Sequence, residues 1–408
     1  MLFKEFTSIL NPHSRRMIFG IFLNAIGNGM SMSLLLVYFH DIRGFSNAFG
    51  GVLLAAEALV GIAVSGPLGA AVDRFGPKRI MVGGLVMASA AAASLSLVTQ
   101  HWQAVVLLTF FAIGGQCIWP SQMVILTRVT PEEDRQKIFG FNFMVLNLGI
   151  GTGGLISSLI IQSGSLRSFQ IMYWCDGLTY LMYLVIILGL KTPHAEKYVA
   201  KEHEPEQGSY KELFAIKELT VLTLAGIILL TFGYGGIQSG IPIFATQYLE
   251  LSPKWLGVIF GVNTFAIVFL QPLVLRLLGR VTKYTALVSV GVIWALSWVF
   301  VGVAPLLTLF ASGLALCVSQ LVFAFGEMVH APTNPALMQE LTPEHIRGRA
   351  SSLMSLQWGI SGVIGPAIAG SMIGSGLETQ WVLVMLLGSL APVPLFWRIR
   401  RHQMRTRS

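Results

Sequence analysis

The sequence contains a succession of apolar runs that are each long enough to cross a lipid bilayer. At 1.5 Å per helical residue, about 20 residues span a bilayer core of roughly 30 Å. Lipid offers no water to the backbone groups, so such runs form helices. We place spans near residues 17–39, 48–71, 80–99, 103–127, 138–162, 170–190, 220–248, 254–277, 285–303, 308–337, 350–373 and 380–399. The sequence therefore predicts an all-α integral membrane protein with about twelve transmembrane helices.

The composition agrees with a membrane protein and excludes several other classes. Hydrophobic residues make up 54% of the chain and charged residues 11%, against about 25% charged residues in soluble domains. Cys117, Cys175 and Cys317 all lie inside apolar runs, so we expect packed thiols and no disulfide framework. The net charge of +8 suits contact with anionic lipid at an inner leaflet, and we expect no nucleic-acid partner.

The distribution of lysine and arginine predicts the orientation in the membrane. The predicted spans place all but three of the 27 Lys and Arg residues on the same side of the membrane as the N-terminus. The exceptions are Arg43, Arg167 and Lys254. Because cations are retained in cytoplasmic loops, both termini are expected in the cytoplasm. The run Met17–Phe39 is too long for the apolar part of a signal peptide. We expect a multi-pass protein of the bacterial inner (cytoplasmic) membrane.

One long hydrophilic stretch divides the chain into two halves. Residues 1–190 are predicted to form an N-terminal six-helix bundle, residues 191–219 a cytoplasmic linker, and residues 220–408 a C-terminal six-helix bundle. His194 and His203 in the linker are expected to be solvated and not metal ligands. The part from Tyr210 to Glu218 could form a short amphipathic helix on the membrane surface.

The two halves repeat each other at their turns. When the halves are aligned at one fixed offset without gaps, Thr130-Pro131-Glu132 falls on Thr342-Pro343-Glu344 and Arg135 falls on Arg347. Parallel halves related by an axis along the membrane normal are one arrangement that transporters use, with the substrate site near the midplane between them.

A charged loop between the second and third spans carries a motif of glycines, one acid and three cations. It resembles the conserved loop after the second helix of the major facilitator superfamily, and its matching residues are Gly69, Asp73, Arg74, Gly76, Lys78 and Arg79. This resemblance implies two pseudo-symmetric six-helix bundles around a central cleft. It also implies a cytoplasmic latch in which Asp73 meets the N-terminus of the eleventh helix, with Arg347 and Arg349 adding charge pairing.

The fifth helix carries a glycine pattern that resembles the motif of antiporters in this superfamily. Its residues are Gly140, Gly149, Gly153 and Gly154, and the second half has Gly365 and Pro366. We expect these residues to allow close helix packing and to set a bend that controls closure of the halves. The pattern departs from the motif because Gly154 replaces a proline. The fourth helix departs as well, since Thr109–Gly115 lacks the arginine that drug:proton antiporters commonly carry there.

Proton coupling requires a carboxylate or histidine at membrane depth, where charged groups are costly and are usually retained for function. The candidates are Glu57 near the midplane, Glu327 with His330 on one face of the tenth span, and Asp176 in the sixth span. Glu57 is the first choice. A purely structural role is the alternative for each of them, and it is favoured for Asp176.

Substrate contacts are expected from the helices that line the central cleft in the superfamily. Their candidate side chains are mostly amides and aromatics, which suit an apolar or cationic organic solute. The candidates are Asn24, Asn28, Gln116, Trp119, Gln122, Asn142, Asn147, Tyr234, Gln238, Asn263, Gln357 and Trp358.

The sequence thus predicts a secondary active transporter that resembles bacterial drug:proton antiporters. We expect proton-coupled efflux of small organic compounds by alternating access, with the proton gradient as energy source, no cofactor, no metal and a monomeric protein. A proton-driven symporter importing amino acids, peptides or sugars is one alternative. A non-transporting membrane receptor or scaffold is another. No catalytic triad or metal-ligand spacing lies at membrane depth, so we do not expect an enzyme.

Overall fold

The computed structural model describes residues 10–161, 165–190 and 208–398, and among these residues it contains helices and no strand. The N-terminal half consists of α2 Pro12–Ser31, η1 Met32–Leu34, α3 Leu35–Val37, η2 Tyr38–Ile42, α4 Asn47–Phe75, α5 Pro77–Leu95, α6 His101–Val129, η3 Glu132–Asp134, α7 Arg135–Ile160 and α8 Leu166–Leu188.

The remaining helices follow the hydrophilic stretch. They are α10 Tyr210–Ala215, α11 Lys217–Leu230, η4 Thr231–Gly235, α12 Gly236–Ile243, η5 Phe244–Tyr248, α13 Lys254–Leu278, α14 Lys283–Val303, η6 Ala304–Leu306, α15 Leu309–Leu341, η7 Glu344–Ile346, α16 Arg347–Gly374 and α17 Glu378–Leu390. Helices α11, η4, α12 and η5 together form one continuous apolar span, Lys217–Tyr248.

The helices account for the predicted transmembrane spans, with one correction at the first of them. In the described part of the chain, 11 helices are long and apolar enough to cross a membrane, and a bent pair makes up to 12. This pair joins Pro12–Ser31 to Leu35–Ile42 at an angle of 40°. The first predicted span, 17–39, is therefore a broken helix, because the 3₁₀ turn Met32–Leu34 interrupts it, and apolar length alone does not reveal such a turn.

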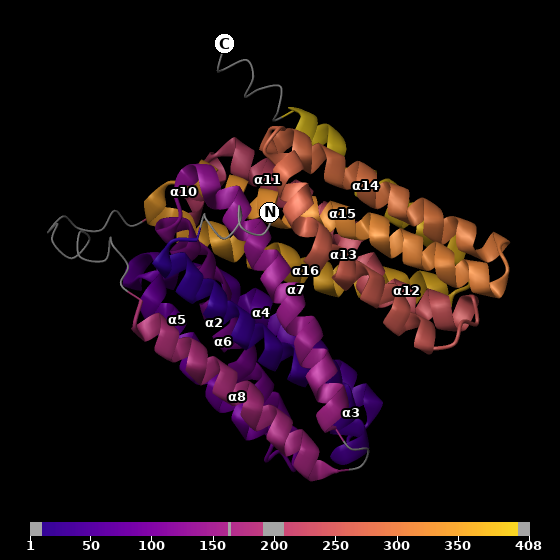
Figure 1. The fold of residues 1–408 in the computed structure, drawn as a ribbon, viewed down its shortest axis with the longest axis horizontal. Helices are drawn as coiled ribbons and strands as arrows, with labels where there is room; N and C mark the ends of the chain where they lie inside the picture. Colours follow the sequence, from indigo (N-terminus) through magenta and orange to yellow (C-terminus); the bar gives the residue numbers. More distant parts are fainter. Residues whose placement is uncertain (1–9, 162–164, 191–207, 399–408) are drawn as a thin grey trace, which may run out of the picture.

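The two halves meet at one end of the molecule and diverge toward the other. Figure 1 shows the indigo and magenta helices of the first half and the orange and yellow helices of the second half meeting near α10 and α11. From there the halves separate toward the ends that carry α3 and α12. We call the end near α10 the closed end and the opposite end the open end.

The turn between α4 and α5 forms as its sequence predicts. Gly76 has a φ of 88°, a left-handed conformation that glycine adopts without strain. Pro77 follows at the first position of α5, where the missing proline N–H costs no hydrogen bond. The chain thus leaves α4 and enters α5 within one residue, which leaves Asp73 in the last turn of α4 at the closed end.

The internal repeat appears as the same local structure in both halves. A 3₁₀ turn over Glu132–Asp134 leads into α7 at Arg135, and a 3₁₀ turn over Glu344–Ile346 leads into α16 at Arg347. Most of the predicted linker, 191–207, lies outside the described residues, as do 1–9 and 399–408. The exact boundaries of the two bundles stay a prediction.

The glycine pattern brings helices close together at three of its positions. Gly149 packs against Ala25 and Gly153 against Ile26 of α2, and Gly140 packs against Leu275 of the other half. Gly154 makes no such contact, because a Cβ placed at this position would meet no atom within 4 Å. In the second half Gly365, which precedes Pro366 inside α16, packs against the backbone of Gly235.

The short helix α10 lies in the described part of the predicted linker, residues 208–219. It begins at Tyr210, as predicted, but ends at Ala215 and is followed at Lys217 by α11. The position of this segment on the membrane surface stays a prediction. The Tyr210 hydroxyl reaches between the two halves at the closed end, where it is hydrogen-bonded to α4 and α16.

The glycine contacts predict opposite effects at two neighbouring positions. A Cβ at Gly153 would collide with the backbone carbonyl of Ile26, whereas a Cβ at Gly154 meets no atom within 4 Å. Gly153→Ala should therefore lower the free energy of unfolding by about 1–3 kcal/mol. Gly154→Ala should leave it equal or raise it by about 0.5–1 kcal/mol. Thermal unfolding in detergent measures both, and equal melting temperatures for the two variants would contradict this packing.

Candidate functional site

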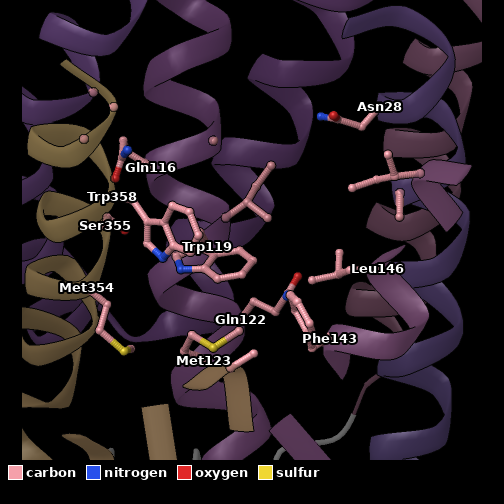
Figure 2. Close-up of a pocket in the computed structure, with 18 of the residues that line it drawn as sticks. Asn28, Gln116, Trp119, Gln122, Met123, Phe143, Leu146, Met354, Ser355 and Trp358 are labelled. Atoms are coloured by element: carbon pink, nitrogen blue, oxygen red, sulfur yellow. The ribbon is translucent and has the colours of Figure 1, made fainter. Parts of the chain in front are cut away.

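A cavity of about 900 Å³ lies between the two halves. Its wall comes from α2, α4, α6, α7 and α8 of the first half and from η4, α12, α13, α15 and α16 of the second. Figure 2 shows Trp119 and Trp358 pointing into this pocket, with Gln122, Phe143 and Met354 around them. A space of this volume and origin can hold a drug-sized organic molecule in contact with both halves.

The cavity brings together eleven of the twelve predicted substrate-cleft residues. They come from six helices, α2, α6, α7, α12, α13 and α16, and from the π-helical turn η4. They are Asn24, Asn28, Gln116, Trp119, Gln122, Asn142, Asn147, Tyr234, Gln238, Asn263 and Trp358.

The prediction for Gln357 is wrong. Its side chain is fully buried, and its Nε2 donates to the backbone carbonyls of Thr223 at 3.0 Å and Leu222 at 3.4 Å. Successive residues of a helix point about 100° apart, so when Trp358 faces the cavity its neighbour Gln357 faces α11. Gln357 therefore joins α16 to α11 and does not reach the cavity.

Two carboxylates line the cavity, one from each half. Glu57 on α4 belongs to the first half, and among the described residues it has no hydrogen bond or ion pair. Glu327 on α15 belongs to the second half and is 5% exposed. Its Oε2 accepts a short hydrogen bond from Asn263 Nδ2, and the Tyr234 hydroxyl interacts with the same carboxylate. The two acids therefore have different surroundings in the same cavity.

His330 lines the cavity one turn beyond Glu327 on α15. Its ring centroid lies 5.7 Å from that of Trp294, and the side chain is buried. The predicted placement of Glu327 and His330 on one face of the helix agrees with this geometry.

Asp176 does not line the cavity. It is fully buried in α8, where its Oδ2 accepts a hydrogen bond of 2.6 Å from Ser31 Oγ on α2. Its Oδ1 has no partner among the described residues. Asp176 therefore joins α8 to α2, and its structural role stays a prediction.

The cavity also has an aromatic side and several unpaired amide atoms. Tyr234 lies with its ring centroid 4.4 Å from Trp358 and 5.3 Å from Trp294. Aromatic faces attract organic cations. Two buried amide atoms at the wall have no partner among the described residues, so they can bond a polar group of a ligand. These atoms are Gln116 Oε1 and Asn142 Oδ1.

The lining of the cavity contains two carboxylates and no lysine or arginine. The described residues also contain no cluster of His, Cys, Asp or Glu that could hold a metal ion. A phosphate or another strongly anionic group would find no cation here. The charge of the wall favours neutral and cationic ligands.

Several residues of the cavity were absent from the predicted set. Tyr180, Asn334 and Ser355 contribute polar groups, and Phe111 and Phe143 contribute aromatic rings. Helical spacing gave a signal for some of them: Asn334 is four residues after His330, and Ser355 is three residues before Trp358. Tyr180 is the one residue that α8 contributes to the cavity wall, so no helical spacing pointed to it.

The closed end carries the predicted contact of Asp73 with the start of α16. Asp73 Oδ1 accepts from the backbone N–H of Gly348, and Oδ2 accepts from the N–H of Arg349 at 3.1 Å and from its Nη1 at 2.8 Å. The Asp73 side chain is 6% exposed. A helix N-terminus has unpaired N–H groups and a partial positive charge, so a carboxylate stabilises it. The first half thereby binds the second half.

The predicted pairing of Asp73 with Arg347 does not form. Arg347 instead lies among Arg128, Arg135, Glu132 and Glu344. In this cluster, Arg128 of the first half is 3.5 Å from Glu344 of the second. Residues two apart in a helix point to nearly opposite sides. Arg347 and Arg349 therefore make different contacts.

The other residues of the charged loop have separate roles. Gly69 leaves room for the side chain of Ser352, and Lys78 Nζ donates to the carbonyls of Leu188 at 3.0 Å and Leu190 at 2.7 Å at the end of α8. Arg74 lies over the ring of Phe75 at 5.3 Å, and Arg79 is exposed.

The matching loop of the second half carries no acid, as the sequence indicates. Lys283 of that loop forms an ion pair with Glu340 of α15, which belongs to the same half. The contact of Asp73 with the opposite half therefore has no counterpart in that loop.

The sequence is similar to a protein-family model and to several known proteins. The sequence model of the Major Facilitator Superfamily matches residues 17–309 and 290–408. The chain is 22% identical to an uncharacterized MFS-type transporter, YqjV of Bacillus subtilis (strain 168), over 97% of this chain and 96% of that protein. It is 23% identical to the multidrug resistance protein MdtH of Yersinia pestis (strain Pestoides F), over 95% and 94%.

Another relative and two solved structures extend this comparison. A Na(+), Li(+), K(+)/H(+) antiporter of Planococcus maritimus is 20% identical over 92% of this chain and 93% of its own length. A bacterial homologue of the iron transporter ferroportin, in an outward-facing state, has a TM-score of 0.78 at 13% identity, covering 95% and 99%. The transporter FucP in the outward conformation has a TM-score of 0.76 at 16% identity, covering 95% and 98%.

The burial of Gln357 predicts a loss of stability for a variant at this position. Gln357→Ala removes the amide that joins α16 to α11 and should lower the free energy of unfolding by about 1–3 kcal/mol. Gln238→Ala is the matched control, because Gln238 is exposed in the cavity and should change stability by less than about 0.5 kcal/mol. Thermal unfolding of both variants without ligand checks this. A stable Gln357 variant would contradict the assignment.

The contact of Asp73 predicts that its loss opens the closed end. Val72 is 1% exposed and lies beside Gly348, so Val72→Cys reports opening through its reaction with a water-soluble maleimide. With Asp73→Asn, the rate of labelling should rise about tenfold or more, since charged hydrogen bonds contribute about 1.5–3 kcal/mol.

The reporter is placed in a background in which Cys117, Cys175 and Cys317 are replaced. Arg74→Gln is the control for the loss of a loop charge, because Arg74 is exposed and contacts Phe75 of its own helix. Unchanged labelling of the Asp73 variant would show that the closed end is held by other contacts.

Proposed function

The chain belongs to the major facilitator superfamily and is therefore a multi-pass membrane transporter, not an enzyme; we propose that it exports small organic compounds in exchange for protons. The observation that carries this proposal is the cavity between the halves, which is lined by Glu57, Glu327 and aromatic rings and contains no lysine or arginine.

The composition of the cavity supports a neutral or cationic organic cargo. The faces of Trp119, Trp358 and Tyr234 offer contact area and attract positive charge. The two carboxylates complement a cation, and a phosphorylated or strongly acidic solute would leave its charge unpaired. The wall draws on both halves, so a cargo in this cavity can be released when the halves move.

Proton exchange is proposed for the same carboxylates. A charged carboxylate at membrane depth is costly, so Glu57 and Glu327 are groups that can take up and release a proton as access to the cavity changes. Glu57 remains the first choice because the described residues give its carboxylate no bond that must break for protonation. Glu327, held by Asn263 and lying beside His330, is the second. The segment Thr109–Gly115 of α6 carries no cation, so coupling would not use an arginine there.

The relatives support export without determining the cargo. MdtH is described as a multidrug resistance protein, and the Planococcus protein exchanges Na(+), Li(+) or K(+) for H(+). Both relatives share about a fifth of their residues with this chain over nearly its whole length. We propose multidrug-type efflux driven by the proton gradient, with no cofactor.

The arrangement of the halves represents one state of an alternating-access cycle. We propose that the closed end faces the cytoplasm, because the charged loop and both chain ends carry the cationic residues that are retained on that side. The halves then diverge toward the outside, in an outward-facing state of a monomer in the bacterial inner membrane. Cargo would leave from this state and protons would enter.

Import by proton symport is the alternative that one observation favours. The wall contains amides that suit a solute with hydroxyl or peptide groups, namely Asn24, Asn28, Asn142, Asn147 and Asn263. Amino acids, peptides or sugars entering vesicles together with protons would identify this function. A receptor or scaffold would bind a ligand and show no counterflow.

The proposal predicts a separation of transport from binding at Glu57. The amide of Glu57→Gln has nearly the same shape but cannot carry the proton, so proton-driven efflux should fall to the level of protein-free vesicles while ligand binding is retained. A cargo is first identified by screening purified protein against a mixed panel of organic compounds for thermal stabilisation. Efflux is then measured in vesicles with an imposed pH gradient.

Glu133→Gln is the matched control, because Glu133 is an exposed carboxylate in the turn before α7. It should retain full efflux. If the Glu57 variant also retains full efflux, Glu57 has no part in the coupling, and the same experiment with Glu327→Gln tests the second carboxylate.

A further inference from the structure

The described end of the linker lies across the joint between the two halves. The Tyr210 hydroxyl donates to the backbone carbonyl of Gly66 on α4 at 2.6 Å and lies 2.9 Å from Ser352 Oγ on α16. One phenol oxygen therefore bonds both halves at once. These bonds lie near the contact of Asp73 with α16, since Ser352 is one turn beyond Gly348.

The residues around Tyr210 hold α4 against α16 and leave space for the phenol hydroxyl. Ser65 Oγ donates to the backbone carbonyl of Ser352 at 2.8 Å, which holds α4 against α16 beside the phenol. Gly66 and Gly69 have no side chain to block the approach: a Cβ at Gly69 would collide with Ser352 and touch the Tyr210 hydroxyl. Burial raises the pKa of the Tyr210 phenol above its usual value of 10.0, so the hydroxyl keeps the proton that it donates.

The ring of Tyr210 contacts the arginine that binds Asp73. The guanidinium of Arg349 lies 5.7 Å from the ring centroid, and its Nη1 donates to Asp73 Oδ2 at 2.8 Å. An arginine between an aromatic face and a carboxylate has its position fixed from two sides. Tyr210 therefore acts on the contact between Asp73 and α16 through Arg349. Its hydroxyl bonds Gly66 and Ser352 and not Asp73.

A second contact fixes the segment to the C-terminal half. Glu212 Oε1 is 2.8 Å from Nε2 of His345, which lies in the turn η7 that precedes α16. Gly208 packs against Ile346 so closely that a Cβ would collide with it. The Ser209 hydroxyl accepts from the N–H of Glu212 and starts α10. Since α10 continues into α11, the segment is anchored in the second half and reaches the first half through Tyr210.

We infer that the segment 208–215 is a strap across the closed end, and that Tyr210 is a positioning residue that holds α4 to α16 and keeps Arg349 against Asp73. The inference goes beyond the proposed function, because it concerns the balance between conformations and is independent of the cargo and of the coupling ion.

The strap has a consequence for the transport cycle. When the closed end opens, Gly66 moves with the first half while Ser352 moves with the second, so the Tyr210 hydroxyl has to give up at least one of its two bonds. A chain segment that already connects the halves thereby adds to the free energy of opening. The strap favours the state in which the opposite end is open, and it does so without a ligand.

Spin labels on the two halves test this inference directly. Exposed positions at the closed end are Leu188 on α8 and Val281 after α13, and exposed positions at the open end are Trp102 on α6 and Leu306 after α14. Each pair is replaced by cysteine in a background without the native cysteines, and pulsed electron paramagnetic resonance gives the distance distribution in detergent without cargo. Tyr210→Phe keeps the ring and removes the hydroxyl.

In Tyr210→Phe, we expect the ratio of molecules with a long distance between the labels at Leu188 and Val281 to molecules with a short distance to rise about tenfold. This change corresponds to the loss of hydrogen bonds that contribute about 1.4 kcal/mol in all. In the molecules whose closed end has opened, the distance between the labels at Trp102 and Leu306 of the open end should be shorter. Tyr248→Phe, a change of the same chemistry at a tyrosine that is 40% exposed after α12, should leave both distributions unchanged. Unchanged distributions in the Tyr210 variant would overturn the inference.

A double-mutant cycle separates positioning from general support of the fold. If the ring of Tyr210 acts through Arg349 on Asp73, then Tyr210→Leu, which removes the ring, should change the distance populations less in an Asp73→Asn protein than in the wild type. Additive effects would refute a role through Arg349. Ser65→Ala breaks a neighbouring bond of the same joint and should produce a shift in the same direction, which guards against a Tyr210 variant that fails to fold. Because no cargo is used, failure of the proposed efflux leaves this test intact.

Discussion

The carboxylate of Asp73 against the first turn of α16 is the interaction on which the arrangement of the two halves depends. It bonds two backbone N–H groups of a helix start and the guanidinium of Arg349, all from the opposite half. Unpaired N–H groups and the partial positive charge of a helix start are present in any helix, so one acid placed at the end of α4 is enough to exploit them. With this end held together, the divergence of the helices elsewhere opens a cavity between the halves.

Helix α4 connects this contact to the chemistry of the cavity. Glu57 and Asp73 lie on the same helix, about 24 Å apart at 1.5 Å per residue. Glu57 faces the space that both halves line, and Asp73 holds the other half. One helix thus carries a proton-binding candidate facing the cavity and a carboxylate that binds the other half, which gives a physical route by which events in the cavity can influence closure. The strap at Tyr210 contacts the same end of that helix.

Much of the fold could be predicted because lipid restricts the chain to long apolar helices and because the turns carry specific residues such as Gly76 and Pro77. Most cleft residues could be predicted because the resemblance indicates which helices line the cleft. The rest depended on side-chain direction and tertiary contact, which the sequence does not encode locally. Gln357 and its neighbour Trp358 are both polar or aromatic, yet only one of them can face the cavity. Arg347 and Arg349 were equivalent as charges and differ in where the helix directs them. The contact of Tyr210 with both halves was hidden in a hydrophilic stretch.

The central claim is that cargo and protons cross in opposite directions through the cavity between the halves. Simultaneous recording of internal pH and of cargo in sealed vesicles, with protein inserted in one orientation, tests it most directly. An imposed cargo gradient alone should drive protons against the direction of cargo movement, and this proton flux should stop when the cargo gradient is removed. Protons that move in the same direction as the cargo, or cargo flux without any change in internal pH, would contradict the account.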